Sequence, residues 1–137
     1  MTVVTVSDTF DAPIDRVWPM VSDFGGIEKY MRGIDSLSTE GSGLGMDRII
    51  GMGGGAVVER LTWLDDAAHS YSYTIVSGDG LPFDRYVATV KLAANGDRTD
   101  IVWEGNFAPK SGQEEAAPKL ARAIYTGGIK GYKAALG

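Results

Sequence analysis

The sequence predicts an α+β fold in which a curved, seven-stranded antiparallel sheet wraps a long C-terminal helix. Strand-like segments follow one another through the middle of the chain, and short turns rich in Gly, Asp and Asn separate them. Helical patterns flank this strand-dense middle on both sides. A sheet and a helix must cover each other's apolar faces, and a strongly bent sheet leaves a space between the two. With 137 residues, we expect one domain spanning residues 1–137.

The N-terminal part reads as a strand followed by two short helical segments. Thr2–Asp11 alternates between apolar and polar residues, which is typical of a half-buried strand. Asp11 is a candidate N-cap and Pro13 suits a first helical turn, so we expect a helix over Pro13–Ser22. A short helical turn should follow at Ile27–Met31.

Six further strands account for the middle of the chain. The turns between them are too short for a parallel crossover, which needs a dozen residues or more, so the strands should be antiparallel. The expected strands are Ile34–Glu40, Met46–Met52, Ala56–Leu64, His69–Val76, Arg85–Ala94 and Thr99–Ala108.

The C-terminal segment predicts a helix over Gln113–Leu136. Its apolar residues recur three or four positions apart, and most of its basic residues lie on the other side. Gly127 and Gly128 interrupt this pattern, each at a cost of about 1 kcal/mol relative to alanine. Either another group approaches the helix closely at these glycines or the helix bends there.

Composition excludes several classes of function. The formal net charge is -5 and no basic block is present, so we do not expect a nucleic-acid partner. The absence of cysteine removes disulfides and thiolate metal sites, and His69 is the only histidine, so we expect neither a metal nor a cofactor. Neither a membrane-spanning run nor an export signal is apparent, which predicts a cytoplasmic location.

The glycine turn after Met52 predicts the register of two strands. If Gly53 and Gly54 form a two-residue primed turn, Arg48 lies opposite Glu59 and Ile50 opposite Val57. These side chains would share the concave face of the sheet. An Arg–Glu pair inside an apolar pocket could hold a polar group of a ligand or orient water. The alternative is a cross-strand salt bridge exposed at the rim, with no other role.

Several local motifs, in this order, resemble the superfamily of START domains, polyketide cyclases and birch-pollen-allergen-like proteins, known as SRPBCC or helix-grip proteins. The bacterial polyketide cyclase/dehydrase-like branch is the most similar. The resemblance covers nearly the whole chain and implies the fold predicted above, with a ligand cavity between sheet and helix. The motifs are Ala12-Pro13 with Val17-Trp18, Asp23-Phe24-Gly25, Gly43-x-Gly45-x-x-Arg48, Glu59-Arg60-Leu61 with Asp65-Asp66, Tyr71 to Ile75, Leu81-Pro82 with Tyr86, and Trp103 to Pro109.

Strand alternation, helix spacing and the resemblance together predict the residues that line the cavity. Leu120, Ile124 and Gly128 are four residues apart and should face it, with Gly128 making room. Glu104 is ambiguous, because alternation points it outward whereas the resemblance points it inward, and a bulge near Gly105 could satisfy both. The predicted ligand-binding residues are Tyr30, Arg48, Ile50, Val57, Glu59, Leu61, Tyr71, Tyr73, Ile75, Leu81, Pro82, Tyr86, Ala88, Glu104, Leu120, Ile124 and Gly128.

Three functions fit this pattern. The first is binding of a small hydrophobic molecule, such as a polyketide, a steroid or a lipid, by a monomer or a homodimer. The second is a cyclase or dehydratase reaction with Glu59, Arg48 and Tyr73 as candidate catalytic residues. The third is regulation of a partner protein through the loop at residues 78–82, which the resemblance implies closes over ligand. Without a histidine in the pocket, a carboxylate would have to act as the base. Because an arginine beside Glu59 stabilises the ionised carboxylate, Glu59 would be a weak base, and this favours binding over catalysis.

Overall fold

A computed structural model describes residues 1–78 and 80–137, and it has the predicted helix-grip architecture. All seven strands form one antiparallel sheet in the order β1-β7-β6-β5-β4-β3-β2. The elements along the chain are β1 (Thr2–Phe10), α1 (Ile14–Val21), the 3₁₀ helix η1 (Phe24–Lys29), β2 (Ser36–Glu40), β3 (Asp47–Met52), β4 (Gly55–Asp65), β5 (Ser70–Ser77), β6 (Phe83–Asn95), β7 (Arg98–Pro109) and α2 (Ala116–Leu136).

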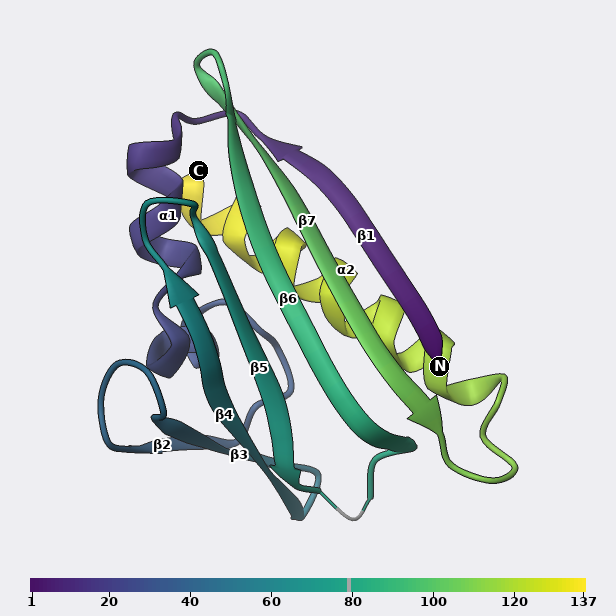
Figure 1. Ribbon diagram of the computed structural model, residues 1–137. Helices are drawn as coiled ribbons and strands as arrows, with labels where there is room; N and C mark the ends of the chain where they lie inside the picture. Colours follow the sequence, from purple (N-terminus) through teal and green to yellow (C-terminus); the bar gives the residue numbers. More distant parts are fainter. Residues whose placement is uncertain (79) are drawn as a thin grey trace.

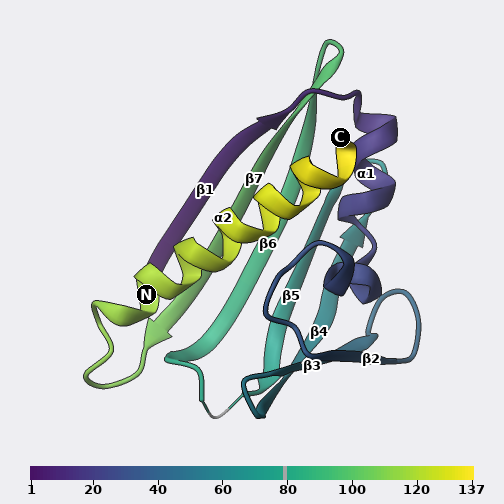
Figure 2. The ribbon, with the colours of Figure 1, turned by 180° about the vertical axis from the view of Figure 1, so that it is seen from behind.

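The helices lie together on the concave face of the sheet. Figures 1 and 2 show α2 crossing this face, while α1 lies against β6 and β7 and η1 lies against β2. Helix α2 lies mainly against β1 and β7, so it covers one half of the sheet more closely than the other. Its buried residues follow helical spacing and face the sheet: Ala117, Ala121, Tyr125, Gly128, Ile129 and Tyr132.

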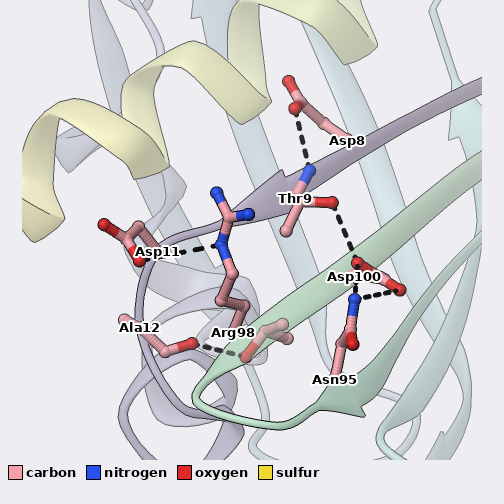
Figure 3. A network of polar contacts seen from close by, with 8 residues as sticks. Asp8, Thr9, Asp11, Ala12, Asn95, Arg98 and Asp100 are labelled. Carbon is pink, nitrogen blue, oxygen red and sulfur yellow. Dashed lines mark hydrogen bonds and ion pairs between the residues drawn. The ribbon is translucent and has the colours of Figure 1, made fainter.

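The start of α1 differs from the prediction. Pro13, not Asp11, is the N-cap residue, and no side chain caps the helix. Asp11 instead pairs with Arg98 (Oδ1 to Nε, 3.7 Å), as Figure 3 shows. The buried Thr99 hydroxyl donates to the carbonyl of Ala12 (2.8 Å). Contacts with the β6–β7 hairpin therefore fix the chain before α1, in place of the expected cap.

Two other boundaries lie further along the chain than predicted. Helix α2 begins at Ala116 rather than Gln113, because residues 111–115 form turns in which Gln113 N–H donates to the carbonyl of Lys110 (2.9 Å). Strand β2 begins at Ser36 rather than Ile34. Ile34 belongs instead to the irregular segment that follows η1.

The glycines of α2 mark a close approach, as the sequence predicted. A Cβ atom at Gly128 would lie 2.6 Å from the ring of Trp103, and one at Gly131 would overlap the carbonyl group of Tyr30. Among the described residues, no atom apart from the chain neighbours and the backbone of α2 itself lies within 4 Å of the corresponding position at Gly127. The sequence predicted that Gly128 makes room for the cavity. This was wrong, because the Trp103 side chain fills the space beside Gly128.

Candidate ligand-binding site

The β3–β4 hairpin has the register that the sequence predicted. Gly53 and Gly54 both have positive φ angles (56° and 85°), which a two-residue primed turn requires and which glycine adopts without strain. Arg48 therefore pairs with Glu59, and Ile50 pairs with Val57. The hairpin thereby places one arginine and one glutamate side by side on the concave face.

Arg48 and Glu59 form a buried ion pair. The Arg48 Nε and Nη2 atoms lie 2.8 and 2.7 Å from the same carboxylate oxygen, Oε1 of Glu59. The side chain of Arg48 is 2% exposed and that of Glu59 is 13% exposed. In the described part of the chain, no group donates a hydrogen bond to the other oxygen, Oε2. Glu59 therefore keeps a free acceptor while Arg48 is largely occupied.

The guanidinium of Arg48 is enclosed on its remaining sides. Its Nη1 donates to the carbonyl of Phe24 (3.0 Å), and its Cζ lies 3.8 Å from the centre of the Phe24 ring and 4.9 Å from that of Tyr73. Burial lowers the pKa of Arg48 and is the largest single influence, but the charge and hydrogen bond of Glu59 together with Tyr73 and Tyr71 outweigh it, so the pKa is raised overall. Arg48 is thus a fixed cation in the wall of the site.

A small cavity of about 90 Å³ adjoins the ion pair. Apart from Arg48 and Glu59, its walls are apolar or aromatic. The lining residues are Ile27, Met31, Ile34, Arg48, Ile50, Met52, Val57, Glu59, Tyr73, Leu81, Trp103 and Ile124. The cavity therefore offers one polar spot in an otherwise hydrophobic space.

A larger groove of about 540 Å³ lies beside this cavity, between α2 and the segment after η1. Met31, Met52 and Ile124 line both spaces. The remaining groove residues are Tyr30, Arg32, Ala123, Gly127, Lys130, Gly131 and Ala134.

Buried tyrosines form two hydrogen-bonded pairs next to the cavity. Trp103 Nε1 donates to the hydroxyl of Tyr73 (3.2 Å), and the hydroxyls of Tyr86 and Tyr125 are hydrogen-bonded. Burial raises the pKa of Tyr73 well above its usual value, and the charge of Glu59 raises it further. Burial also raises the pKa of Tyr125 to about 12, although its hydrogen bond with Tyr86 acts in the opposite direction. The phenols are therefore neutral hydrogen-bonding groups at physiological pH.

The structure brings seven of the seventeen predicted ligand-binding residues together around the inner cavity. They are Arg48, Ile50, Val57, Glu59, Tyr73, Leu81 and Ile124. Tyr30 lines the outer groove instead. Leu81 and Pro82 belong to the 78–82 loop, of which Asp79 lies outside the described residues. The role of that loop in regulating a partner stays a prediction.

Some of the predicted residues lie elsewhere. Leu120 is 37% exposed and lines a separate, open depression with Pro82, because α2 crosses the sheet at an angle that carries this turn away from the cavity. Ile75 and Tyr86 line another surface depression. The remaining predicted residues on the concave side are packed in the core rather than lining the cavity: Leu61, Tyr71, Ala88 and Gly128.

Glu104 faces the convex side of the sheet. It pairs with Thr5 on β1 and Thr89 on β6, whereas the neighbouring Gly105 pairs with the buried Val4 and Ala88. Alternation in β7 is unbroken at Gly105, and the register irregularity of this strand pair lies between Asp84 and Val87 instead. The prediction of Glu104 as a cavity residue was therefore wrong, because the bulge it needed is absent at that point of β7.

Five cavity residues were missing from the predicted set: Ile27, Met31, Ile34, Met52 and Trp103. For two of them, the sequence contained a pattern that could have identified them as cavity residues. The glycine turn placed Met52 on the concave face, and alternation placed Trp103 inward. Ile27, Met31 and Ile34 lie in or after η1, where neither helical nor strand periodicity indicates a direction.

The fold and cavity define an α+β protein of the helix-grip class, a fold suited to ligand binding. The chain belongs to the family described as "Polyketide cyclase / dehydrase and lipid transport", whose model matches residues 1–137. No curated protein matches the sequence. None of the helices in the described residues is long and apolar enough to span a membrane.

Solved structures share this fold at low sequence identity. Protein XoxI from Bacillus cereus is 24% identical with a TM-score of 0.89, and the match covers 98% of this chain and 95% of that one. An uncharacterized protein from Bacillus thuringiensis is 23% identical with a TM-score of 0.87, covering 98% of both chains. Norcoclaurine synthase from Thalictrum flavum, solved with dopamine and hydroxybenzaldehyde, is 16% identical with a TM-score of 0.83, covering 98% of this chain and 86% of that one.

Proposed function

We propose that this protein binds a small apolar molecule whose polar end is a hydrogen-bond donor, such as an alcohol or a phenol. The apolar part would occupy the cavity beside Ile50, Val57 and Ile124, and the donor would reach Glu59. Family membership supports a hydrophobic ligand, since the family description includes polyketide chemistry and lipid transport.

The observation that carries the proposal is the asymmetry of the Arg48–Glu59 pair. Arg48 donates to Glu59 and to the Phe24 carbonyl and packs against the rings of Phe24 and Tyr73, so it is poorly placed to bind a ligand anion. Glu59 uses one oxygen for Arg48, and its second oxygen has no partner among the residues described. The polar spot of the cavity is therefore an acceptor, which favours a donor and repels a carboxylate.

The test compares 1-decanol with its methyl ether, which lacks the donor, by isothermal titration calorimetry. The wild-type protein should bind the alcohol more tightly by about tenfold, because a hydrogen bond to a charged acceptor contributes roughly 1.5–3 kcal/mol. In Glu59→Gln this preference should disappear, whereas Glu104→Gln on the convex face should retain it. Equal wild-type affinities for the alcohol and the ether would refute the proposed role of Glu59.

A reaction is the second candidate, because Glu59 and Tyr73 line the same cavity. A carboxylate acceptor and a neutral phenol donor are the two groups needed to take a proton from a carbon acid and hydrogen-bond to the developing enolate oxygen. Norcoclaurine synthase shows that a protein of this fold can be an enzyme. Hydrogen–deuterium exchange of a 1,3-diketone, followed by NMR, separates the two functions. An enzyme would accelerate the exchange and lose this acceleration in Glu59→Gln, whereas a carrier would not change the rate.

A further inference from the structure

The inner cavity is too small to hold a typical ligand by itself. Its volume is about 90 Å³, whereas pockets for small molecules usually measure roughly 300–1,000 Å³. The outer groove adds about 540 Å³. A ligand anchored at Glu59 would therefore extend out of the inner cavity, and the neighbouring groove lies in its path.

Three flexible or aliphatic side chains separate the two spaces. Met31, Met52 and Ile124 line both, and the Met52 side chain is half exposed at the tip of the β3–β4 hairpin. The Met52 Cε atom also approaches the position of a Cβ at Gly33 (3.8 Å), so the hairpin tip contacts the segment that follows η1. Methionine adapts to neighbouring groups at low cost, so these side chains can part around an apolar chain.

The outer groove carries two cations. Arg32 and Lys130 line it from opposite sides, one after η1 and the other on α2, and both are exposed. Within residues 1–78 and 80–137, neither has an acidic partner, whereas nearby cations such as Lys29 and Lys133 are paired with aspartates. In a chain with a net charge of -5, these two positive charges make the groove suitable for an anion.

We propose that the ligand is an elongated molecule with two different polar ends. Its hydroxyl end binds Glu59 in the inner cavity, its apolar middle passes between Met31, Met52 and Ile124, and an acidic end group lies between Arg32 and Lys130. The binding of the hydroxyl end at Glu59 rests on the proposed function. The binding of the acidic end between Arg32 and Lys130 is independent of it.

The test compares 10-hydroxydecanoic acid with 1,10-decanediol, which has the same chain and hydroxyl but a neutral outer end. Affinities are measured by calorimetry for the wild type, Arg32→Gln, Lys130→Gln and the double variant, with Lys91→Gln on the convex face as the control. The hydroxy acid should bind more tightly than the diol, and the double variant should weaken its binding about tenfold. The affinity for the diol should be unchanged in all variants, and Lys91→Gln should behave as the wild type. High salt should weaken binding of the hydroxy acid but not of the diol.

The outcomes separate this inference from the proposed function. If the wild type binds both compounds equally and the double variant changes neither, the acidic subsite is refuted while ligand binding in the cavity stands. If the wild type binds neither compound, both proposals fail. If Lys91→Gln weakens the hydroxy acid as much as Lys130→Gln does, the effect is one of net charge and the subsite is again refuted.

Discussion

The concave face of the sheet has a tightly packed half and an open half. Under β6 and β7, Tyr125 stacks on Trp103 with ring centres 5.1 Å apart and bonds to Tyr86, and a Cβ at Gly105 would overlap the Tyr125 hydroxyl. Under β3 and β4, mostly aliphatic side chains line the cavity beside Glu59, and Tyr73 and Trp103 complete its wall. The same sheet face thus makes a core in one half and a binding site in the other.

The difference arises from how large residues are matched by small ones. Gly105 and Gly128 provide the space that Tyr125 and Trp103 fill, so aromatic rings close the contact between α2 and β7. Among the described residues, β3 and β4 contribute no aromatic ring to the cavity wall; α2 is further away there, and Met31 and Met52 only partly fill the gap. The cavity therefore lies where the helix no longer follows the curvature of the sheet.

The largest expected effect is alkaline destabilisation of the packed half. An unfolded tyrosine ionises near pH 10, whereas the pKa of the buried Tyr125 is raised to about 12. Between these values the unfolded state holds fewer protons than the native state, so stability is intact below about pH 10 and falls as pH rises. At pH 11, Tyr125 alone should account for a loss of about 1.4 kcal/mol.

Urea unfolding at pH 9 and pH 11 measures this loss. The pKa values of Tyr71, Tyr73, Tyr86 and Tyr132 are also raised by burial, so the total for the wild type should reach several kcal/mol. Tyr125→Phe should reduce the difference between the two pH values by at least about 1.4 kcal/mol, because Tyr125 also helps to raise the pKa values of Tyr86 and Tyr73. An unchanged difference in this variant would show that Tyr125 ionises as freely in the folded state as in the unfolded state.

Next in size is the effect of filling space in each half. Gly105→Ala adds a methyl group against Tyr125, whose hydroxyl and ring are both held in place, and should destabilise the protein by about 1–3 kcal/mol. Val57→Ile adds a methylene to the wall of the cavity and should be neutral or stabilising by up to ~0.8 kcal/mol. The free energies of unfolding in urea test both. A similar loss in the two variants would mean that the open half is as tightly packed as the other.

The sequence was most informative where local chemistry determines geometry. A two-residue glycine turn fixes strand register, so the Arg48–Glu59 pairing could be predicted without knowing the fold. Alternation in β7 was equally reliable, and the prediction for Glu104 failed only where the resemblance was allowed to compete with it. Periodicity identifies from local sequence alone which face of an element a residue lies on. The strand register at Arg48 and the direction of Glu104 could therefore be predicted.

Features that depend on the placement of whole elements could not be predicted. Helical spacing put Leu120 and Ile124 on one face of α2, but the crossing angle of the helix decides that only Ile124 reaches the inner cavity. Met31 and Ile34 lie in irregular segments whose direction follows from packing. The small volume of the cavity likewise depends on how closely Trp103 packs against Gly128.

A similarly small effect is expected at Gly127, which lies beside Gly128 but on the open side of α2. Apart from the backbone of α2 itself, a Cβ at Gly127 would meet no atom of the described residues within 4 Å, so no packing contact requires glycine there. Gly127→Ala should stabilise the protein by up to ~1 kcal/mol, because alanine favours the helix and restricts the unfolded chain. Gly128→Ala, one residue along, should destabilise it instead, because its Cβ would lie 2.6 Å from the Trp103 ring. Thermal unfolding of the two variants gives the sign of each change. Opposite signs at adjacent positions would locate the boundary between the packed half and the groove within one turn of α2, whereas a loss of stability in both would place Gly127 in the packed half.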